Sequence, residues 1–188
     1  MSSLKPKGRR NLSRDDWMDH AIQILATKGI GAVTVDSLAK QLGITRGSFY
    51  HHFEDRQDLL KSILDYWIEA WTMDIRESIA NLGLDASSSL IALINSIRSQ
   101  RAADYDAAIR SWAMNDEFAA DYVRRADEIR LEFISSLFEQ LGFEGEELEA
   151  RARMLLYYEA FEPMMFAKPD SETSKKLIAI RHGLLTAR

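Results

Sequence analysis

Apolar residues recur at intervals of three and four along most of this chain, which is the period of an amphipathic α-helix. Proline occurs at positions 6, 163 and 169, and the long stretch between the first two has no strand-like alternation of apolar and polar residues. The pattern therefore predicts an all-α fold of about nine helices. They are expected near residues 13–28, 34–41, 45–53, 55–82, 87–101, 103–114, 117–141, 146–166 and 172–186.

The first of these helices has both a start signal and a stop signal. Ser13 is a preferred N-cap residue, and an acid at Asp16 is favoured by the helix dipole. Lys28 and Gly29 mark the end, because a cation in the last turn and a glycine after it are typical of helix C-termini. The positions expected to face a core are Trp17, Ala21, Ile24 and Leu25.

The next two helices are short and are joined by a tight turn. Thr34 and Thr45 can each cap a first helical turn, and Gly43 supplies the positive φ that a sharp turn needs. Two such helices covered by a preceding helix have the geometry of a helix-turn-helix. In that motif the second helix enters the major groove of DNA with its N-terminal residues at the base edges.

The residue types of the second short helix suit contact with DNA. Phe49 and Phe53 are four positions apart and are expected to face the core. Arg46 can pair bidentately with guanine, and Gly47 lets the backbone approach the groove wall closely. The positions left facing outward or sideways also include Ser48, Tyr50 and His51.

Other side chains in this segment suit the DNA backbone. The hydroxyls of Thr34, Thr45 and Tyr50 can donate to phosphate oxygens. Arg56 and Lys61, at the start of the fourth helix, are expected to clamp the DNA backbone on the far side.

The charge distribution agrees with a polyanionic partner at this end. The chain has a net charge of −5, but residues 1–61 carry +3 and the remainder −8. Lys5, Lys7, Arg9 and Arg10 form a basic arm without an acid. Such a basic end beside an acidic body suggests nucleic-acid binding, although a solvated tail is the alternative reading.

The sequence shows few signals of secretion, membrane insertion, catalysis or metal binding. The chain has no cysteine, which fits a reducing cytosol, and it has neither a secretory signal nor an apolar run long enough to span a membrane. No nucleophile elbow, phosphate loop or dinucleotide fingerprint occurs, and the adjacent His51 and His52 are poor joint metal ligands. We therefore expect a cytoplasmic protein that is not an enzyme and has no catalytic residue, metal site or cofactor.

At these residues the sequence closely resembles the DNA-binding domain of the tetracycline-repressor (TetR) family. The match covers roughly residues 13–64, and its most specific part is Gly43 to Phe53. The resemblance implies a DNA-binding domain at 1–61 and a helical ligand-binding and dimerisation domain at 62–188. It also implies phosphate contacts by Thr34, Thr45, Tyr50 and His52, and base contacts by Arg46, Gly47, Ser48 and His51. Arg56 stands where the family more usually has a lysine.

Large apolar side chains in the second half are candidates for a ligand pocket. The candidates are Trp67, Trp71, Trp112, Tyr157 and Phe161. Arg101, Arg110 or Glu159 are candidates to orient a polar ligand. For any single aromatic residue at helical spacing, ordinary core packing is the alternative.

The last two helices are candidates for a dimer interface. The resemblance implies that they pack with those of a second subunit as a four-helix bundle, although such stripes equally well close a monomer's own core. The two stripes are Leu148, Ala152, Leu155, Leu156 and Ala160, and Leu177, Ile180, Leu184 and Leu185.

The sequence-based hypothesis is a homodimeric transcriptional repressor that binds a palindromic operator in double-stranded DNA and is released by an unidentified small-molecule effector. One alternative is a second half that serves dimerisation only, without an effector pocket. Another is a helical-bundle enzyme or small-molecule carrier.

Overall fold

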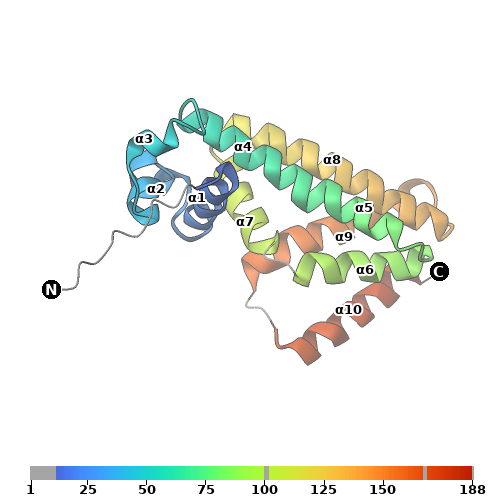
Figure 1. The fold of residues 1–188 in the computed structure, drawn as a ribbon. Coiled ribbons are helices and arrows are strands. Elements are labelled where there is room, and N and C mark those ends of the chain that lie inside the picture. The colour runs from blue at the N-terminus through green and yellow to red at the C-terminus, as the bar shows by residue number, and fades with distance from the viewer. Residues whose placement is uncertain (1–11, 100–101, 167–168, 188) are drawn as a thin grey trace.

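The computed structural model describes residues 12–99, 102–166 and 169–187, and within these ranges the chain is all helical. The predicted basic arm with Lys5, Lys7, Arg9 and Arg10, and the candidate Arg101, lie outside the described residues. The α-helices are α1 (Arg14–Lys28), α2 (Val35–Leu42), α3 (Arg46–Phe49), α4 (Arg56–Ile68), α5 (Asp74–Asn81), α6 (Ala86–Ser99), α7 (Ala102–Ala113), α8 (Glu117–Gln140), α9 (Gly145–Met165) and α10 (Ser171–Thr186) (Figure 1).

The helix starts predicted from local signals are confirmed. The Ser13 hydroxyl accepts a hydrogen bond from the Asp16 amide, and the Asp16 carboxylate accepts one from the Ser13 amide, which is a complete capping box. Thr34 caps α2 in the same reciprocal way with Ser37. Gly43 has a φ of 68°, the left-handed conformation expected for the turn.

Helix α3 is shorter than predicted, because it ends at Phe49 rather than near Phe53. The carbonyl of Phe49 accepts hydrogen bonds from the amides of both His52 and Phe53, so the chain leaves the helix in a tightened turn. This turn brings the ring of Phe53 against that of Phe49, with ring centroids 5.2 Å apart. Both rings are buried, as the sequence predicted.

Helices α4 and α5 form one continuous rod that contains a π-helical turn at Glu69–Met73 (Figure 1). The predicted helix over 55–82 is therefore confirmed in extent, and counting the rod once gives nine helices in the described residues. Asp55 caps the rod by accepting a hydrogen bond from the Asp58 amide at 2.9 Å. The π turn was not predicted.

The buried apolar residues form two clusters that meet along the rod. One cluster joins α1–α4 to Ile109 and Trp112 of α7, so the first three helices rest on the second half of the chain. The other lies between α5, α6, α8, α9 and α10. Figure 1 shows the rod running beside α8, with α6, α9 and α10 beyond it. The predicted boundary between residues 61 and 62 falls inside α4, so a rigid element crosses it.

None of the helices in the described ranges is long and apolar enough to cross a bilayer.

Candidate nucleic-acid interface and ligand cavity

Helix α3 is fixed to the core by one face, which leaves its other face open. The ring of Phe49 meets the ring of Trp17 edge-on at 5.4 Å, and both side chains are fully buried. Arg14 holds the following loop, because it donates hydrogen bonds to the His52 carbonyl at 3.0 Å and to the Ser62 hydroxyl at 2.6 Å. Of the residues predicted to contact DNA here, Thr45, Arg46, Gly47, Tyr50 and His51 are exposed, and Ser48 and His52 are partly buried.

Gly47 is not needed as a glycine by the fold itself. A Cβ atom built at this position meets the Thr45 hydroxyl at 3.7 Å, which is ordinary van der Waals contact. Its φ is not positive, so the backbone conformation is open to any residue. The missing side chain therefore leaves a small flat area on the outer face of α3, where another molecule can approach the helix backbone.

Arg46 is not free at this surface, because its guanidinium pairs with Asp36 of α2. Both side chains are well exposed, and such pairs contribute little to stability. The pair instead ties the position of Arg46 to α2. This ion pair is not evident from the sequence, because the two residues belong to different helices.

Arg56 and Lys61, which were predicted to contact the DNA backbone, already have hydrogen-bond partners within the chain. Arg56 donates hydrogen bonds to the carbonyl of Val33 at 2.6 Å and to that of Ile30 at 3.0 Å, so it fastens the start of α2 to α4. Lys61 donates to Asp65 at 2.6 Å, and this hydrogen bond and charge raise the pKa of Lys61. Phosphate contact by either residue stays a prediction.

The hydroxyls of Thr34 and Thr45 differ in the hydrogen bonds that they make within the chain. The Thr34 hydroxyl accepts the Ser37 amide at 3.1 Å, which leaves its own O–H to donate outward. Thr45 stands at the predicted N-cap position of α3, but the prediction that it caps the helix is wrong, because its hydroxyl makes no cap bond and lies 3.5 Å from the Ser48 hydroxyl. Both can serve an acceptor such as a phosphate oxygen.

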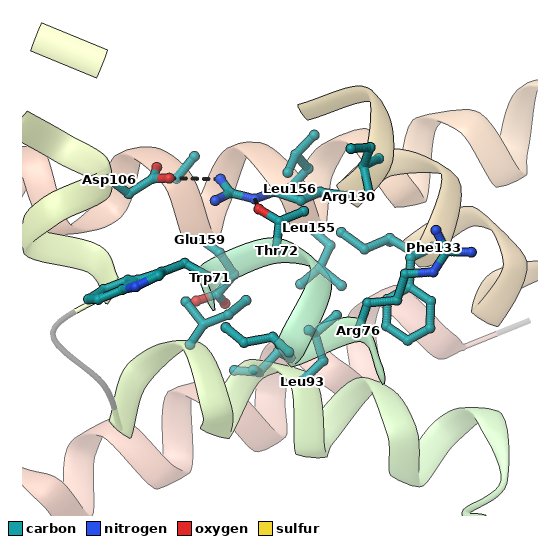
Figure 2. A pocket seen from close by; sticks show the side chains of 16 residues that line it. Trp71, Thr72, Arg76, Leu93, Asp106, Arg130, Phe133, Leu155, Leu156 and Glu159 are labelled. Carbon is teal, nitrogen blue, oxygen red and sulfur yellow. Dashed lines mark hydrogen bonds and ion pairs between the residues drawn. The ribbon is translucent and has the colours of Figure 1, made fainter. Parts of the chain in front are cut away.

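A cavity of about 70 Å³ lies in the second half of the chain, between the rod and helices α6, α8 and α9 (Figure 2). Most of its wall is aliphatic or aromatic. The lining residues are Trp71, Thr72, Ile75, Arg76, Leu93, Ile94, Ile97, Asp106, Ile129, Arg130, Phe133, Ile134, Leu155, Leu156, Glu159 and Ala160.

Two ion-pair networks form the polar part of this wall. In one, Asp106 accepts hydrogen bonds from Arg110 at 2.6 Å and from Arg130 at 2.7 Å, while Arg110 also pairs with Asp127. Arg130 further donates to the Thr72 hydroxyl at 3.0 Å. Burial alone would raise the pKa of Asp106, but the two guanidinium groups lower it below its ordinary value.

The second network surrounds Glu159. Its carboxylate accepts a hydrogen bond from Arg181 and lies 3.9 Å from Arg98, which also pairs with Glu162. Burial raises the pKa of Glu159 against the opposing effect of these arginines. Each network is therefore neutral, with two cations and two anions.

Comparison with known proteins finds a family match for the N-terminal segment of the chain. Residues 18–63 match the model of a family described as bacterial regulatory proteins, tetR family. This segment therefore matches the DNA-binding domain of the tetR family. The HTH-type transcriptional repressor KstR2 of Rhodococcus jostii is 35% identical over 81 residues, which cover 43% of this chain and 39% of that protein. The matches thus span about two fifths of the length of the first curated relatives.

Solved structures share the whole fold of this chain. The fatty acid degradation regulator FadR from Bacillus halodurans superposes with a TM-score of 0.70, at 22% identity and over 97% of both chains. AibR, solved in complex with isovaleryl coenzyme A and operator DNA, gives a TM-score of 0.73 at 13% identity, over 92% of this chain and 97% of AibR. At these identities the likeness shows the fold.

The structure moves the candidate pocket away from four of its five predicted residues. Trp71 lines the cavity. Trp67 and Trp112 are buried core residues, Trp67 beneath the guanidinium of Arg130 and Trp112 donating to the Asp116 carboxylate at 2.9 Å. Tyr157 and Phe161 are exposed on α9. Of the predicted polar groups, Glu159 lines the cavity and Arg110 lies behind it in the Asp106 network. The aliphatic wall was missed, since Ile and Leu at helical spacing carry no signal that separates a cavity from a core.

The predicted interface stripe on α9 is also corrected. Ala152, Leu155, Leu156 and Ala160 are buried within the chain's own core, and Leu148 is partly buried. On α10, Leu177, Ile180 and Leu184 are exposed as predicted, but Leu185 is buried. The exposed apolar residues of α9 lie on its other face and are Met154, Tyr157, Phe161, Met164 and Met165.

Proposed function

We propose that this chain is a homodimeric transcriptional repressor that binds a palindromic operator and leaves it when a small molecule occupies the cavity. The observation that carries the proposal is the open outer face of α3 around Gly47, where the fold provides room for the approach of a partner. A helix anchored by Phe49 and Trp17 presents this face rigidly, as major-groove reading requires.

The exposed groups of this face divide into two roles. We assign base contacts to Arg46, Gly47, Ser48 and His51, and phosphate contacts to Thr34, Thr45, Tyr50 and His52. Phosphate contacts fix the register of the protein on the duplex, and base contacts carry the sequence preference. The guanidinium of Arg46 is paired with Asp36 in the free protein, so base contact by Arg46 requires this exposed pair to open.

Dimerisation is supported by the unpartnered apolar faces of α9 and α10. The exposed residues of α9 recur at positions 154, 157, 161 and 164, and those of α10 at 177, 180 and 184. These spacings of three and four are those of helices that pack in a bundle. Two such helices from each of two subunits form a four-helix interface. A two-fold dimer presents two copies of α3, which matches a palindromic operator.

The rod provides a physical link between the cavity and the DNA-binding face. Its α4 part packs with α1–α3, and its π turn and α5 part line the cavity through Trp71, Thr72 and Arg76. AibR, which shares the fold, was solved with both isovaleryl coenzyme A and operator DNA. We therefore propose that ligand binding shifts the rod and with it the separation of the two α3 helices.

Gly47→Ala tests the assignment of the α3 face. Alanine is a better helix former than glycine and clashes with nothing in the free protein, so the variant keeps its thermal stability. The added methyl group occupies the space needed by the groove wall, so DNA affinity falls at least tenfold. Gly31→Ala is the matched control, because that glycine also has open space and no positive φ. Equal DNA affinity of Gly47→Ala and the wild type would contradict the assignment of the α3 face. If the chain is instead a small-molecule carrier or an enzyme, neither the wild type nor the variant should bind duplex DNA.

A further inference from the structure

Arg76 is the one charged residue of the cavity wall without a counter-charge among the residues that the structure describes. The other three charged wall residues, Asp106, Arg130 and Glu159, belong to the two neutral networks. Arg76 makes no ion pair or hydrogen bond there, and its guanidinium lies over the ring of Phe133 at 6.0 Å. Because both networks are neutral when their members behind the wall are counted, the positive charge of Arg76 is the one left unbalanced at the cavity.

The neighbours of Arg76 along its own helix explain why it stays unpaired. Side chains three and four positions away share a face of a helix, and here these are Thr72, Met73, Ile79 and Ala80, none of them acidic. Thr72 also lines the cavity, and its hydroxyl accepts a hydrogen bond from Arg130, which leaves the O–H to donate elsewhere. The rod thus offers the cavity a guanidinium and a hydroxyl donor without an acceptor for either.

The rest of the wall is apolar, and the part outside the rod is built from three helices. Ile94 and Ile97 come from α6, Phe133 and Ile134 from α8, and Leu155 from α9. Apolar cavity walls with a few placed polar groups are typical of sites that bury a ligand's hydrocarbon body and orient its head. Here the head-orienting groups are donors only.

We infer that the ligand of this cavity is an amphipathic anion, a carboxylate with an aliphatic body, whose head pairs with Arg76. The inference rests on the proposed ligand-responsive function and names the chemical class of its effector. Arginine binds carboxylate through two parallel hydrogen bonds, which a lone hydroxyl or an ammonium head cannot reproduce. The aliphatic body lies against the residues of α6, α8 and α9.

The cavity is smaller than such a ligand, so binding of the ligand is expected to move the rod. A cavity of about 70 Å³ is less than half of the roughly 150 Å³ that accommodates benzene. A chain of several carbons therefore displaces part of the wall. The wall elements that carry the head-binding groups are the π turn and α5, so the displacement falls on the rod.

The test compares straight-chain probes that differ in their head groups. Butanoate, hexanoate and octanoate are titrated into the full chain by calorimetry, with 1-octanol and octylammonium as matched uncharged and cationic heads. The variants are Arg76→Gln, which removes the charge, and Arg76→Lys, which keeps it. Arg125→Gln is the matched control, because Arg125 is an exposed arginine of α8 outside the cavity. Thermal melting without ligand establishes that each variant is folded.

A carboxylate is expected to bind the wild type and Arg125→Gln equally. Arg76→Gln should weaken it by roughly tenfold to a hundredfold, the usual effect of a lost charge-assisted hydrogen bond. Arg76→Lys should recover part of the loss, and the affinity for 1-octanol should not change between variants. The inference is overturned if octylammonium binds more tightly than the carboxylates, if the Arg76 variants bind carboxylates as tightly as the wild type, or if no carboxylate binds.

The inference and the proposed function fail separately. If the chain binds carboxylates through Arg76 but does not bind duplex DNA, the proposed repressor function is wrong and the inferred ligand class stands. If the chain binds its operator but binds none of the carboxylates, the repressor function stands and the inferred ligand class is wrong.

Discussion

The guanidinium Nε of Arg130 donates a hydrogen bond to the hydroxyl of Thr72 at 3.0 Å, and so joins α8 to the π-helical turn of the rod. The same guanidinium pairs with Asp106 and lies over the ring of Trp67 at 4.9 Å. One side chain therefore touches the π turn, α7 and α4. Helices α4 and α7 also pack against α1–α3. The contacts of Arg130 therefore connect the cavity wall to the helices that carry the proposed DNA-binding face.

Arg130→Met is expected to destabilise the fold strongly. The substitution leaves the buried Asp106 carboxylate with one cation instead of two, and breaking a buried pair in this way typically costs about 3–5 kcal/mol. Urea unfolding of wild type and variant measures the cost. Thr72→Val removes the acceptor but no charge, so its cost should be clearly smaller. Similar costs for the two variants would show that the Asp106 pair contributes little.

The pH dependence of stability should carry the signature of Asp106. Its pKa is lowered in the folded chain, so its contribution to stability is present above the ordinary carboxyl pKa of 3.8 and is lost as the pH falls through the folded value. The unfolding free energies of wild type and Asp106→Asn should therefore approach each other on acidification from neutral pH to below that value. Chemical denaturation at several pH values measures the difference. A gap that stays constant in acid contradicts the depressed pKa.

Asp36→Asn should strengthen DNA binding. The substitution releases Arg46 from its ion pair and removes a negative charge from the surface that faces the phosphates. Fluorescence anisotropy with a labelled operator measures the change, and Asp74→Asn on the rod serves as a charge-matched control. Weaker binding by Asp36→Asn would mean that Asp36 is needed to position Arg46.

Leu184→Glu should give a folded monomer. Leu184 is 72% exposed on α10, so its replacement costs the subunit little, while a charge in a bundle seam opposes association. Sedimentation velocity reports the oligomeric state, and Lys175→Glu on the same helix is the control for an added acid. A dimer that persists in Leu184→Glu places the interface elsewhere. The monomer should also bind the operator more weakly than the dimer.

The features that sequence alone predicted are those set by residues a few positions apart. Ser13 with Asp16, and the glycine at 43, determine helix ends through local hydrogen bonds and φ preference, and the structure confirms them. Phe49 and Phe53 were correctly placed in the core because their spacing fixes their face.

The features that sequence could not give depend on contacts between distant residues. Helix α9 has apolar residues on two faces, and only the packing of α8 against it shows that Leu155 faces inward while Phe161 stays outside. Arg56 carries an ordinary basic-residue signal for phosphate, yet it is engaged by carbonyls more than twenty positions away. The cavity exists where several helices fail to fill the space between them, which no single helical pattern records.

Selection of duplexes by the full chain from a random DNA pool at low ionic strength tests the binding of DNA by α3 most directly. We expect a palindrome whose half-sites are about one helical turn apart. We further expect that Arg46→Ala loses roughly 1–3 kcal/mol of discrimination at one base pair of each half-site. Recovery of no preferred duplex, or a selected site unaltered by Arg46→Ala and Gly47→Ala together, would contradict the reading of DNA by α3.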